Sequence, residues 1–307
     1  MAKKEDLGFG DKYDKNEKRL FNKDGSFNVK KTGVLRGVRD IYIHLIEMNW
    51  AKFILMLFST YFVLNLLFAL LYFSIGVEYL DGARTGNALQ NYMSCLYFSS
   101  QTFTTVGYGT ISPVGVPVNL IASIEAMIGL LSFALATGLL FGRFSRANLK
   151  LKFSENILIS DYSKNNGKGL MFRVTNRRDT TLLDTSAEVI ATTFFIDENG
   201  EMKRNYSRLE LELSEIKMFP SLWTIVHPID ENSIFGQYSL EELKEKNLEI
   251  LVLIKSHDET YGQIVHARTS YKGEEIVDNA NFVKSALLTK EGDFKMDIDT
   301  IGEFVRK

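Results

Sequence analysis

Cysteine and histidine are scarce in this chain, and their scarcity excludes several kinds of site. Cys95 is the single cysteine among 307 residues, so neither an intrachain disulfide nor a thiolate metal cluster can form. The four histidines are not spaced as a ligand pair on one helix, which argues against a metal site. Lysine and arginine total 36 against 38 acidic residues, and this net charge of −2 gives no reason to expect nucleic acid as a partner.

Signs of nucleotide binding, voltage sensing and catalysis are also missing. The second half of the chain has no G-x-G-x-x-G loop, because the GKG at residues 167–169 does not extend to one. No helix carries repeated arginines, so a dedicated voltage sensor is absent. Nothing from residue 150 onward resembles a catalytic constellation, so we expect neither an enzyme nor a cofactor.

Long apolar runs, by contrast, occur at residues 53–73 and 118–141. The first run carries no charge, and Glu125 is the only charge in the second. About 20 helical residues cross a hydrocarbon core of ~30 Å, so each run predicts a membrane-spanning helix, with a buried core helix as the alternative. The first run begins too far into the chain, and is too long, for a signal peptide.

Basic residues flank these runs on one side. The connector at residues 76–116 contains a single basic residue, Arg84. Basic residues precede the first run and follow the second: Lys30, Lys31, Arg36, Arg39, Lys52, Arg143, Arg146, Lys150 and Lys152. The positive-inside rule therefore predicts a multi-pass protein of the cell (inner) membrane with both termini in the cytoplasm. The absence of a cysteine pair in the connector favours a bacterial source.

Shorter segments complete the membrane part. Residues 35–50 place Leu35, Val38, Ile41, Tyr42, Leu45, Ile46 and Trp50 at helical spacing, which predicts an amphipathic helix on the inner membrane surface. An amphipathic helix on a soluble core is the alternative. Residues 91–103 are apolar but too short to span, which is typical of a re-entrant segment.

The pattern changes near residue 150. Short β-rich runs alternate with turn residues, as in GLMFRVTN, AEVIATTFFI, RLELELSEI and EILVLIKS. Such runs without long helices between them predict an antiparallel sandwich, and residues 239–246 read as its one clear helix. We expect a cytoplasmic segment at 1–34, a pore domain at 35–149 and a regulatory all-β, immunoglobulin-like sandwich at 150–307.

The T-V-G-Y-G stretch at residues 105–109 lies between the two runs, where irregular backbone is tolerated only if protein buries it or it lines a watery cavity. Carbonyls that all point one way need dihedrals of alternating hand, and Gly107 and Gly109 supply positive φ at little cost. Val106 and Tyr108 would then point away and pack on the short helix. Rings of such oxygens replace the hydration shell of K⁺, and one chain provides one wall, so we predict a homotetramer.

The chain resembles prokaryotic (KirBac-type) inward-rectifier potassium channels over nearly its whole length. The resemblance lies in RLFNKDGSFNV, VRDIYIHLIEMNW, QTFTTVGYG, ALATGLLFGRFSR, VHPIDENSIFG and SHDETYGQIVHARTSY. It implies a passive K⁺ channel whose only metal ion is K⁺ at the filter.

The resemblance also implies residue roles. It assigns the K⁺ filter to Thr105, Val106, Gly107, Tyr108 and Gly109, a helix-bundle gate to Phe141, and a pore-cavity position to Phe133. Gly129 and Gly138 are candidate bending points, with close helix packing as the alternative. The implied cytoplasmic constriction loop comprises Ser256, His257, Asp258, Glu259, Thr260, Tyr261 and Gly262. Anionic lipid head groups are assigned to Arg143, Arg146 and Lys150, with the positive-inside rule alone as the alternative.

Several positions depart from the family pattern. Phe133 and Lys255 stand where strongly rectifying members carry acids, so we expect weak polyamine block. Gln101 and Ile111 replace an ion pair beside the filter of eukaryotic relatives, which puts filter rigidity in question. Glu125 is either functional or hydrogen-bonded behind the filter, and we favour the second.

Two other hypotheses compete with a K⁺ channel gated from its β domain. A membrane-anchored binding or signalling protein would leave the filter stretch unexplained. A channel with an inverted pore loop, like bacterial glutamate-gated channels, conflicts with the distribution of lysine and arginine.

Overall fold

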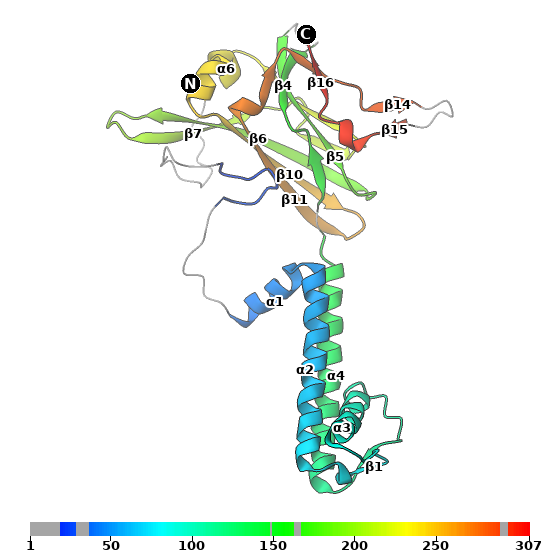
Figure 1. Cartoon of the computed structure of the whole chain (residues 1–307). Coiled ribbons are helices and arrows are strands. Elements are labelled where there is room, and N and C mark those ends of the chain that lie inside the picture. The colour runs from blue at the N-terminus through cyan, green and yellow to red at the C-terminus, as the bar shows by residue number, and fades with distance from the viewer. Residues whose placement is uncertain (1–18, 29–36, 148, 163–166, 289–293) are drawn as a thin grey trace. The chain divides into compact units, whose positions relative to one another are not determined.

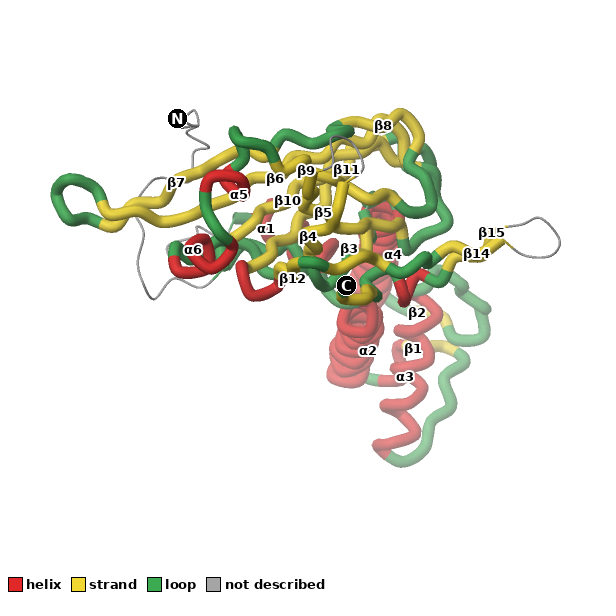
Figure 2. Tube along the Cα trace, turned by 90° about the horizontal axis from the view of Figure 1, so that it is seen from above, coloured by secondary structure: helices red, strands yellow, loops and turns green. Residues whose placement is uncertain are grey.

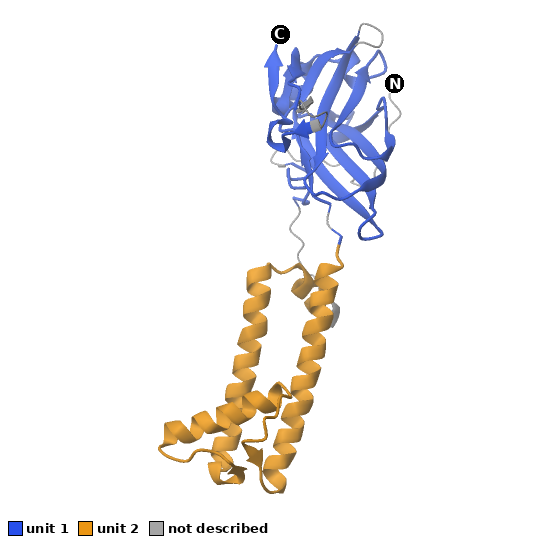
Figure 3. Ribbon diagram, turned by 90° about the vertical axis from the view of Figure 1, so that its right-hand side faces the viewer, with its two compact units in different colours: residues 1–32, 147–307 blue, residues 33–146 orange. Residues whose placement is uncertain are grey.

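The computed structural model describes residues 19–28, 37–147, 149–162, 167–288 and 294–307. The chain divides into two compact units, coloured in Figure 3. Gly33–Arg146 forms the membrane unit, and Met1–Thr32 together with Ala147–Lys307 forms the β unit. The contacts thus group the described N-terminal residues with the β unit, whereas the sequence analysis set residues 1–34 apart.

The membrane unit contains a surface helix, two long helices and a short helix between them. In chain order its elements are α1 (Val38–Glu47), α2 (Trp50–Ile75), η1 (Val77–Tyr79), β1 (Leu80–Asp81), α3 (Ala88–Phe103), β2 (Ser112–Pro113) and α4 (Val116–Phe144). Side-chain oxygens of Asn49 and Asn87 accept backbone N–H groups at the start of α2 and α3, which satisfies donors that a helix leaves unpaired. Figure 1 shows α3 beside the half of α2 and α4 that is remote from α1.

The two long helices match the predicted spanning runs. α2 has 26 residues and α4 has 29, and both are long and apolar enough to cross a membrane. Only 17% and 11% of their most apolar windows are buried within the chain, whereas a core helix of a soluble protein would be mostly buried. This exposed apolar surface therefore agrees with helices that face lipid and other subunits.

The short helix α3 is held between the long ones by an apolar cluster. Cys95 and Phe98 of α3 pack with Tyr72 of α2 and with Val118 and Ala122 of α4. The rings of Tyr72 and Phe98 meet edge to face, with centroids 5.0 Å apart. The predicted re-entrant segment is thus a helix that enters the unit and ends at the filter stretch.

The β unit is a sandwich of two five-stranded sheets (Figure 2). One sheet has the order β11-β10-β6-β7 with β8 on β6, and the other has the order β12-β4-β5-β3 with β9 on β5. Its strands are β3 (Leu151–Phe153), β4 (Ile157–Tyr162), β5 (Gly167–Asn176), β6 (Leu182–Ile196), β7 (Met202–Leu209), β8 (Glu215–Met218), β9 (Trp223–Ile229), β10 (Glu249–Asp258), β11 (Gln263–Lys272), β12 (Ile276–Asp278), β13 (Ala280–Phe282), β14 (Ala286–Leu288), β15 (Phe294–Met296) and β16 (Phe304–Arg306).

The pairing within both sheets is antiparallel except between β4 and β12. Buried side chains from facing sheets, including Phe172, Trp223, Val189 and Ile250, form one core. The predicted helix at 239–246 is α6 (Leu240–Glu245), which Ser239 caps, and a shorter helix, α5 (Ile234–Gln237), precedes it. The predicted sandwich is therefore confirmed.

The described N-terminal residues lie on the β unit. Phe21 is buried against Ile190, Tyr206 and Leu251. The backbone N–H of Leu20 donates to the Glu249 carboxylate, and the Ser270 hydroxyl donates to the Phe21 carbonyl at 2.6 Å. These contacts explain why the start of the chain groups with strands more than 160 residues away.

Candidate functional site

The filter stretch begins where α3 ends, and its backbone alternates in hand. Thr105, Gly107 and Gly109 have φ of 58°, 52° and 78°, and the residues between them do not have positive φ. A Cβ on Gly107 or Gly109 would meet nothing within 4 Å, so the dihedral rather than space requires glycine. We did not expect the left-handed backbone conformation of Thr105. A non-glycine residue in that conformation stores strain of about 1–3 kcal/mol, as is common at functional sites.

Backbone hydrogen bonds tie this stretch to the end of α3. The carbonyl of Gln101 accepts the N–H groups of Val106 and Gly107 at 3.0 and 3.2 Å, and the Thr102 carbonyl accepts the N–H of Thr105 at 3.0 Å. With these N–H groups directed back to the helix, the stretch can present its carbonyls on the opposite side.

The side chains of Val106 and Tyr108 differ from the expectation. They are 54% and 78% exposed in the single chain, so the chain by itself does not bury them against α3 as expected. This exposure leaves both side chains available to a neighbouring subunit.

A polar cluster joins α3 to both long helices behind the filter. The Tyr72 hydroxyl donates to Glu125 Oε2 at 2.6 Å, and the Ser99 hydroxyl lies 2.5 Å from Oε1. Ser99 also reaches Asn65 at 3.1 and 3.2 Å, while the hydroxyls of Tyr61 and Ser100 are 2.7 Å apart. Glu125 is fully buried, and its hydrogen bonds agree with the favoured interpretation of this carboxyl.

The two inner-helix glycines differ in their surroundings. A Cβ on Gly129 would lie 2.0 Å from the carbonyl oxygen of Phe103, so this glycine permits close packing of α4 on the end of α3. A Cβ on Gly138 would meet nothing within 4 Å, which leaves the bending-point hypothesis open there. Phe133 and Phe141 are each 73% exposed, so their own chain leaves both rings uncovered.

Arg143 has a placement that the sequence did not indicate. Its guanidinium donates to the carbonyls of Leu45, Ile46 and Met48 at 2.5, 2.9 and 2.6 Å. Its Cζ also lies 4.5 Å from the ring centroids of both Trp50 and Phe53. The predicted head-group role does not fit this placement, because the cation already satisfies the carbonyls at the end of α1.

Arg146 and Lys150, the other basic residues assigned to lipid head groups, differ from Arg143. Arg146 pairs with Glu47 at 2.9 Å, and both side chains are about half exposed. Lys150 belongs to the β unit, so its proximity to Arg146 is known from the sequence alone.

The predicted constriction loop is the end of a hairpin. Ser256, His257 and Asp258 are the last residues of β10, and only Glu259–Gly262 form the turn. The buried Asp258 carboxylate accepts N–H groups of Thr260 and Tyr261 at 3.0 and 3.3 Å, and Gly262 has a φ of 61°. The Ser256 hydroxyl contacts Thr185 at 2.7 Å. These bonds define one conformation for a turn that was expected to be a longer loop.

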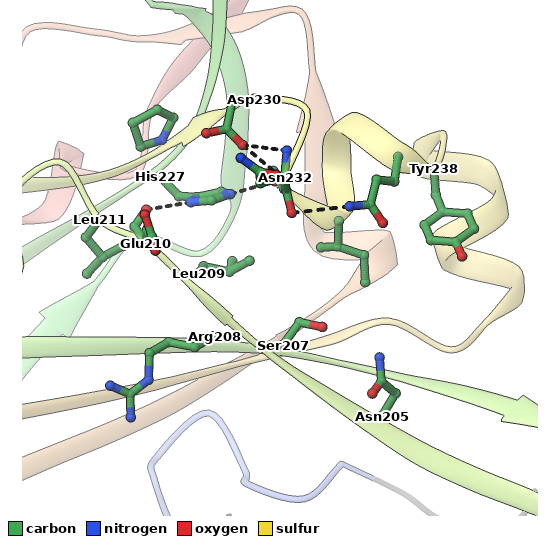
Figure 4. A pocket seen from close by; sticks show the side chains of 14 residues that line it. Asn205, Ser207, Arg208, Leu209, Glu210, Leu211, His227, Asp230, Asn232 and Tyr238 are labelled. Atoms are coloured by element: carbon green, nitrogen blue, oxygen red, sulfur yellow. Dashed lines mark hydrogen bonds between the residues drawn. The ribbon is translucent and has the colours of Figure 1, made fainter. Parts of the chain in front are cut away.

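The VHPIDENSIFG stretch builds a polar groove in the β unit (Figure 4). His227 Nδ1 lies 2.6 Å from the Glu210 carbonyl oxygen, and Nε2 lies 2.7 Å from the Ser233 hydroxyl. Asp230 accepts the N–H groups of Asn232 and Ser233 at 2.9 Å. Burial lowers the pKa of His227, and both ring nitrogens are engaged, so this histidine links β9 to its neighbours rather than offering a metal ligand.

Comparisons with known proteins cover both units. Residues 151–306 match the model of the inward rectifier potassium channel C-terminal domain, and residues 48–146 match an ion channel model. The inward rectifier potassium channel Kirbac3.1 of Paramagnetospirillum magnetotacticum is 33% identical over 292 residues, covering 94% of this chain and 96% of that protein.

More distant relatives are animal proteins. The ATP-sensitive inward rectifier potassium channel 15 of Homo sapiens is 27% identical, covering 95% of this chain and 83% of its own length. The G protein-activated inward rectifier potassium channel 4 of Mus musculus is 25% identical, covering 93% and 72%. A solved structure of Spo0M from Bacillus subtilis covers 43% of this chain and 50% of its own at a TM-score of 0.24, too low to support an argument.

Proposed function

Because the chain belongs to the inward rectifier potassium channel family, whose members are ion channels rather than enzymes, we propose that it conducts K⁺ passively through a homotetrameric pore. The alternating backbone of residues 105–109 carries this proposal. Carbonyl oxygens arranged in this way replace the water that a K⁺ ion loses on entering the filter.

The surfaces of the single chain support assembly around an axis. Val106 and Tyr108 are exposed at the filter, and α2 and α4 expose most of their apolar side chains. Identical copies related by cyclic symmetry would cover these side chains and close the ring of carbonyls.

Gating is assigned to Phe141 on α4 and to the turn after β10. Exposed phenylalanine rings from several subunits can meet at the axis and exclude water, which closes a pore without a charged plug. Gly138, three residues before Phe141, has free space around it and can act as the bending point. The Glu259–Gly262 turn would form a second, cytoplasmic narrowing.

We place the protein in a bacterial inner membrane with both termini in the cytoplasm. Anionic head groups would act through Arg146 and Lys150, because an exposed ion pair such as Arg146–Glu47 contributes about 0–1 kcal/mol and a phosphate can compete with it. Phe133 offers polyamines no charge, so bilayer recordings with internal spermine should show weak block, and steep block would contradict this assignment.

Substitution of Gly107 tests the filter assignment. Gly107→Ala places a Cβ on a residue with φ of 52°, which costs about 1–2 kcal/mol of backbone strain in a left-handed conformation. We expect reconstituted mutant tetramers to lose K⁺ selectivity in reversal-potential measurements. A correctly assembled mutant with unchanged selectivity would show that these residues are not the filter.

A further inference from the structure

Gln101, in the last turn of α3, contacts both the filter stretch and the segment that follows it. Its backbone carbonyl accepts the N–H groups of Val106 and Gly107, and its side-chain Nε2 donates to the carbonyl of Ile111 at 3.0 Å. The residue is only 9% exposed. One residue therefore joins the start of the filter to the chain that leaves it.

We propose that the Gln101 side-chain amide is a positioning group for the filter, which holds its outer end through the Ile111 carbonyl. The inference rests on the proposed K⁺ conduction. It assigns to an uncharged amide the mechanical task that an ion pair would otherwise perform, so the loss of charge at positions 101 and 111 need not loosen the filter.

The surroundings favour a persistent bond. Gln101 lies in the same turn of α3 as Ser99 and Ser100, which form hydrogen bonds with Glu125 and Tyr61. These bonds hold the turn that carries the amide. A hydrogen bond in such a low-dielectric setting is stronger than in water, and removing its donor leaves the carbonyl without its side-chain partner. The carbonyl ladder ends at Gly109, so movement of Ile111 would act directly on the outer carbonyls.

Charged groups nearby do not replace this donor. Glu125 on α4 is hydrogen-bonded to Tyr72 and Ser99, and Asp81 on β1 pairs in register with Ser112, next to Ile111. Glu78 and Arg84 lie in the same connector. These charged groups are unchanged in the variants described below. Any effect of their titration on selectivity therefore also appears in the wild-type protein, which serves as the control.

Two substitutions separate the donor from the bulk of the side chain. Gln101→Met keeps the length of the side chain but has no N–H, and Gln101→Glu donates only when its carboxyl is protonated. Gln90→Met, the same change at the other end of α3, is the matched control because it removes only the exposed capping bond from the Asn87 N–H to Gln90 Oε1, remote from the filter in sequence. Full-length tetramers are reconstituted in liposomes, and ⁸⁶Rb⁺ uptake is measured against Na⁺ competition from pH 5 to pH 8.

We expect Gln101→Met to assemble as a tetramer but to lower Rb⁺ over Na⁺ selectivity about tenfold, equivalent to about 1.4 kcal/mol. Gln90→Met should keep the selectivity of the wild type. Gln101→Glu should regain selectivity as the pH falls, because only the protonated carboxyl can donate to the Ile111 carbonyl. A selective Met variant, or a Glu variant whose selectivity does not rise as the pH falls, would overturn the inference. A wild type that does not select Rb⁺ would instead contradict the proposed function.

Discussion

At the scale of single residues, two glycines of α4 have opposite surroundings and therefore opposite expected tolerance. Gly129→Ala would force a Cβ against the Phe103 carbonyl oxygen, and such overpacking costs about 1–3 kcal/mol. Because Phe103 ends α3 two residues before the filter stretch, we expect this variant to lose tetramer stability or ion selectivity. Size-exclusion chromatography and Rb⁺ over Na⁺ flux measure the two effects.

Gly138→Ala is the matched comparison, since its Cβ meets open space. The variant should assemble and select K⁺ normally. It should also open less readily, because alanine favours the straight helix by about 1 kcal/mol over glycine. Equal damage from both substitutions would contradict the packing role of Gly129.

His227 gives the β unit a pH dependence whose direction follows from its burial. Because burial lowers the pKa of the folded imidazole below 6.5, the unfolded chain binds more protons as the solution becomes acidic. Its contribution to stability is therefore complete above about pH 6.5 and is lost as the pH falls toward the folded pKa.

Thermal denaturation at pH 7.5 and 5.5, followed by the fluorescence of buried Trp223, tests this expectation. His227→Gln should lower the midpoint at pH 7.5 and reduce the difference between the two pH values. His266→Gln, at an exposed histidine of β11, is the control and should change neither. A wild-type difference that persists in His227→Gln would assign the effect to other groups.

At the scale of elements, sequence patterns predicted the secondary structure of each segment more successfully than its tertiary contacts. Long apolar runs identified α2 and α4, and short β-rich runs between turn residues identified the sandwich, because these patterns depend on local solvent preference. The left-handed Thr105 and the link between His227 and Ser233 were not predicted, and close packing at Gly129 was only an alternative that did not identify Phe103 as its partner. Each depends on which elements meet in space.

The connection between α1 and α4 shows the same limit. Positive charge near residue 143 indicated a cytoplasmic membrane face, and it equally suited a lipid ligand. Only the structure shows that the cation of Arg143 is directed at the carbonyls that end α1. The spacing of charge along a sequence carries no information about this direction.

The inner helix is expected to close the pore at Phe141. Phe141→Ala removes an exposed ring, so it should widen and wet the crossing and raise basal flux without changing selectivity. Leu135→Ala, at another exposed position of α4, is the control and should leave basal flux unchanged. Unchanged flux in folded Phe141→Ala channels would move the gate to the turn after β10.

The segment that follows α4 is expected to set the response to anionic lipid. Each basic residue near an anionic surface contributes about 1 kcal/mol, so neutralising Arg146 and Lys150 together should remove about 2 kcal/mol, roughly thirtyfold in apparent affinity. Flux titrated with a phosphoinositide measures this change. Lys217→Gln, at an exposed lysine of β8, should leave the titration unchanged, and an unshifted double mutant would reduce these residues to topology determinants.

At the scale of the whole molecule, the two units have separable tasks in this account. The membrane unit supplies the two long apolar helices and the proposed filter stretch, and the β unit supplies a sandwich that also binds the described N-terminal residues. Both units match models of ion-channel families, and relatives align over more than nine-tenths of the chain. The proposed function therefore rests on assembly, since a single chain would provide only one wall of the proposed filter.

The most direct test of this account is ⁸⁶Rb⁺ uptake into liposomes that contain the purified full-length protein. External K⁺ should compete with the tracer, and the same concentration of Na⁺ should not, because the filter carbonyls replace the hydration shell of K⁺ and Rb⁺. Uptake that Na⁺ and K⁺ reduce equally, from tetramers of verified assembly, would contradict K⁺-selective conduction.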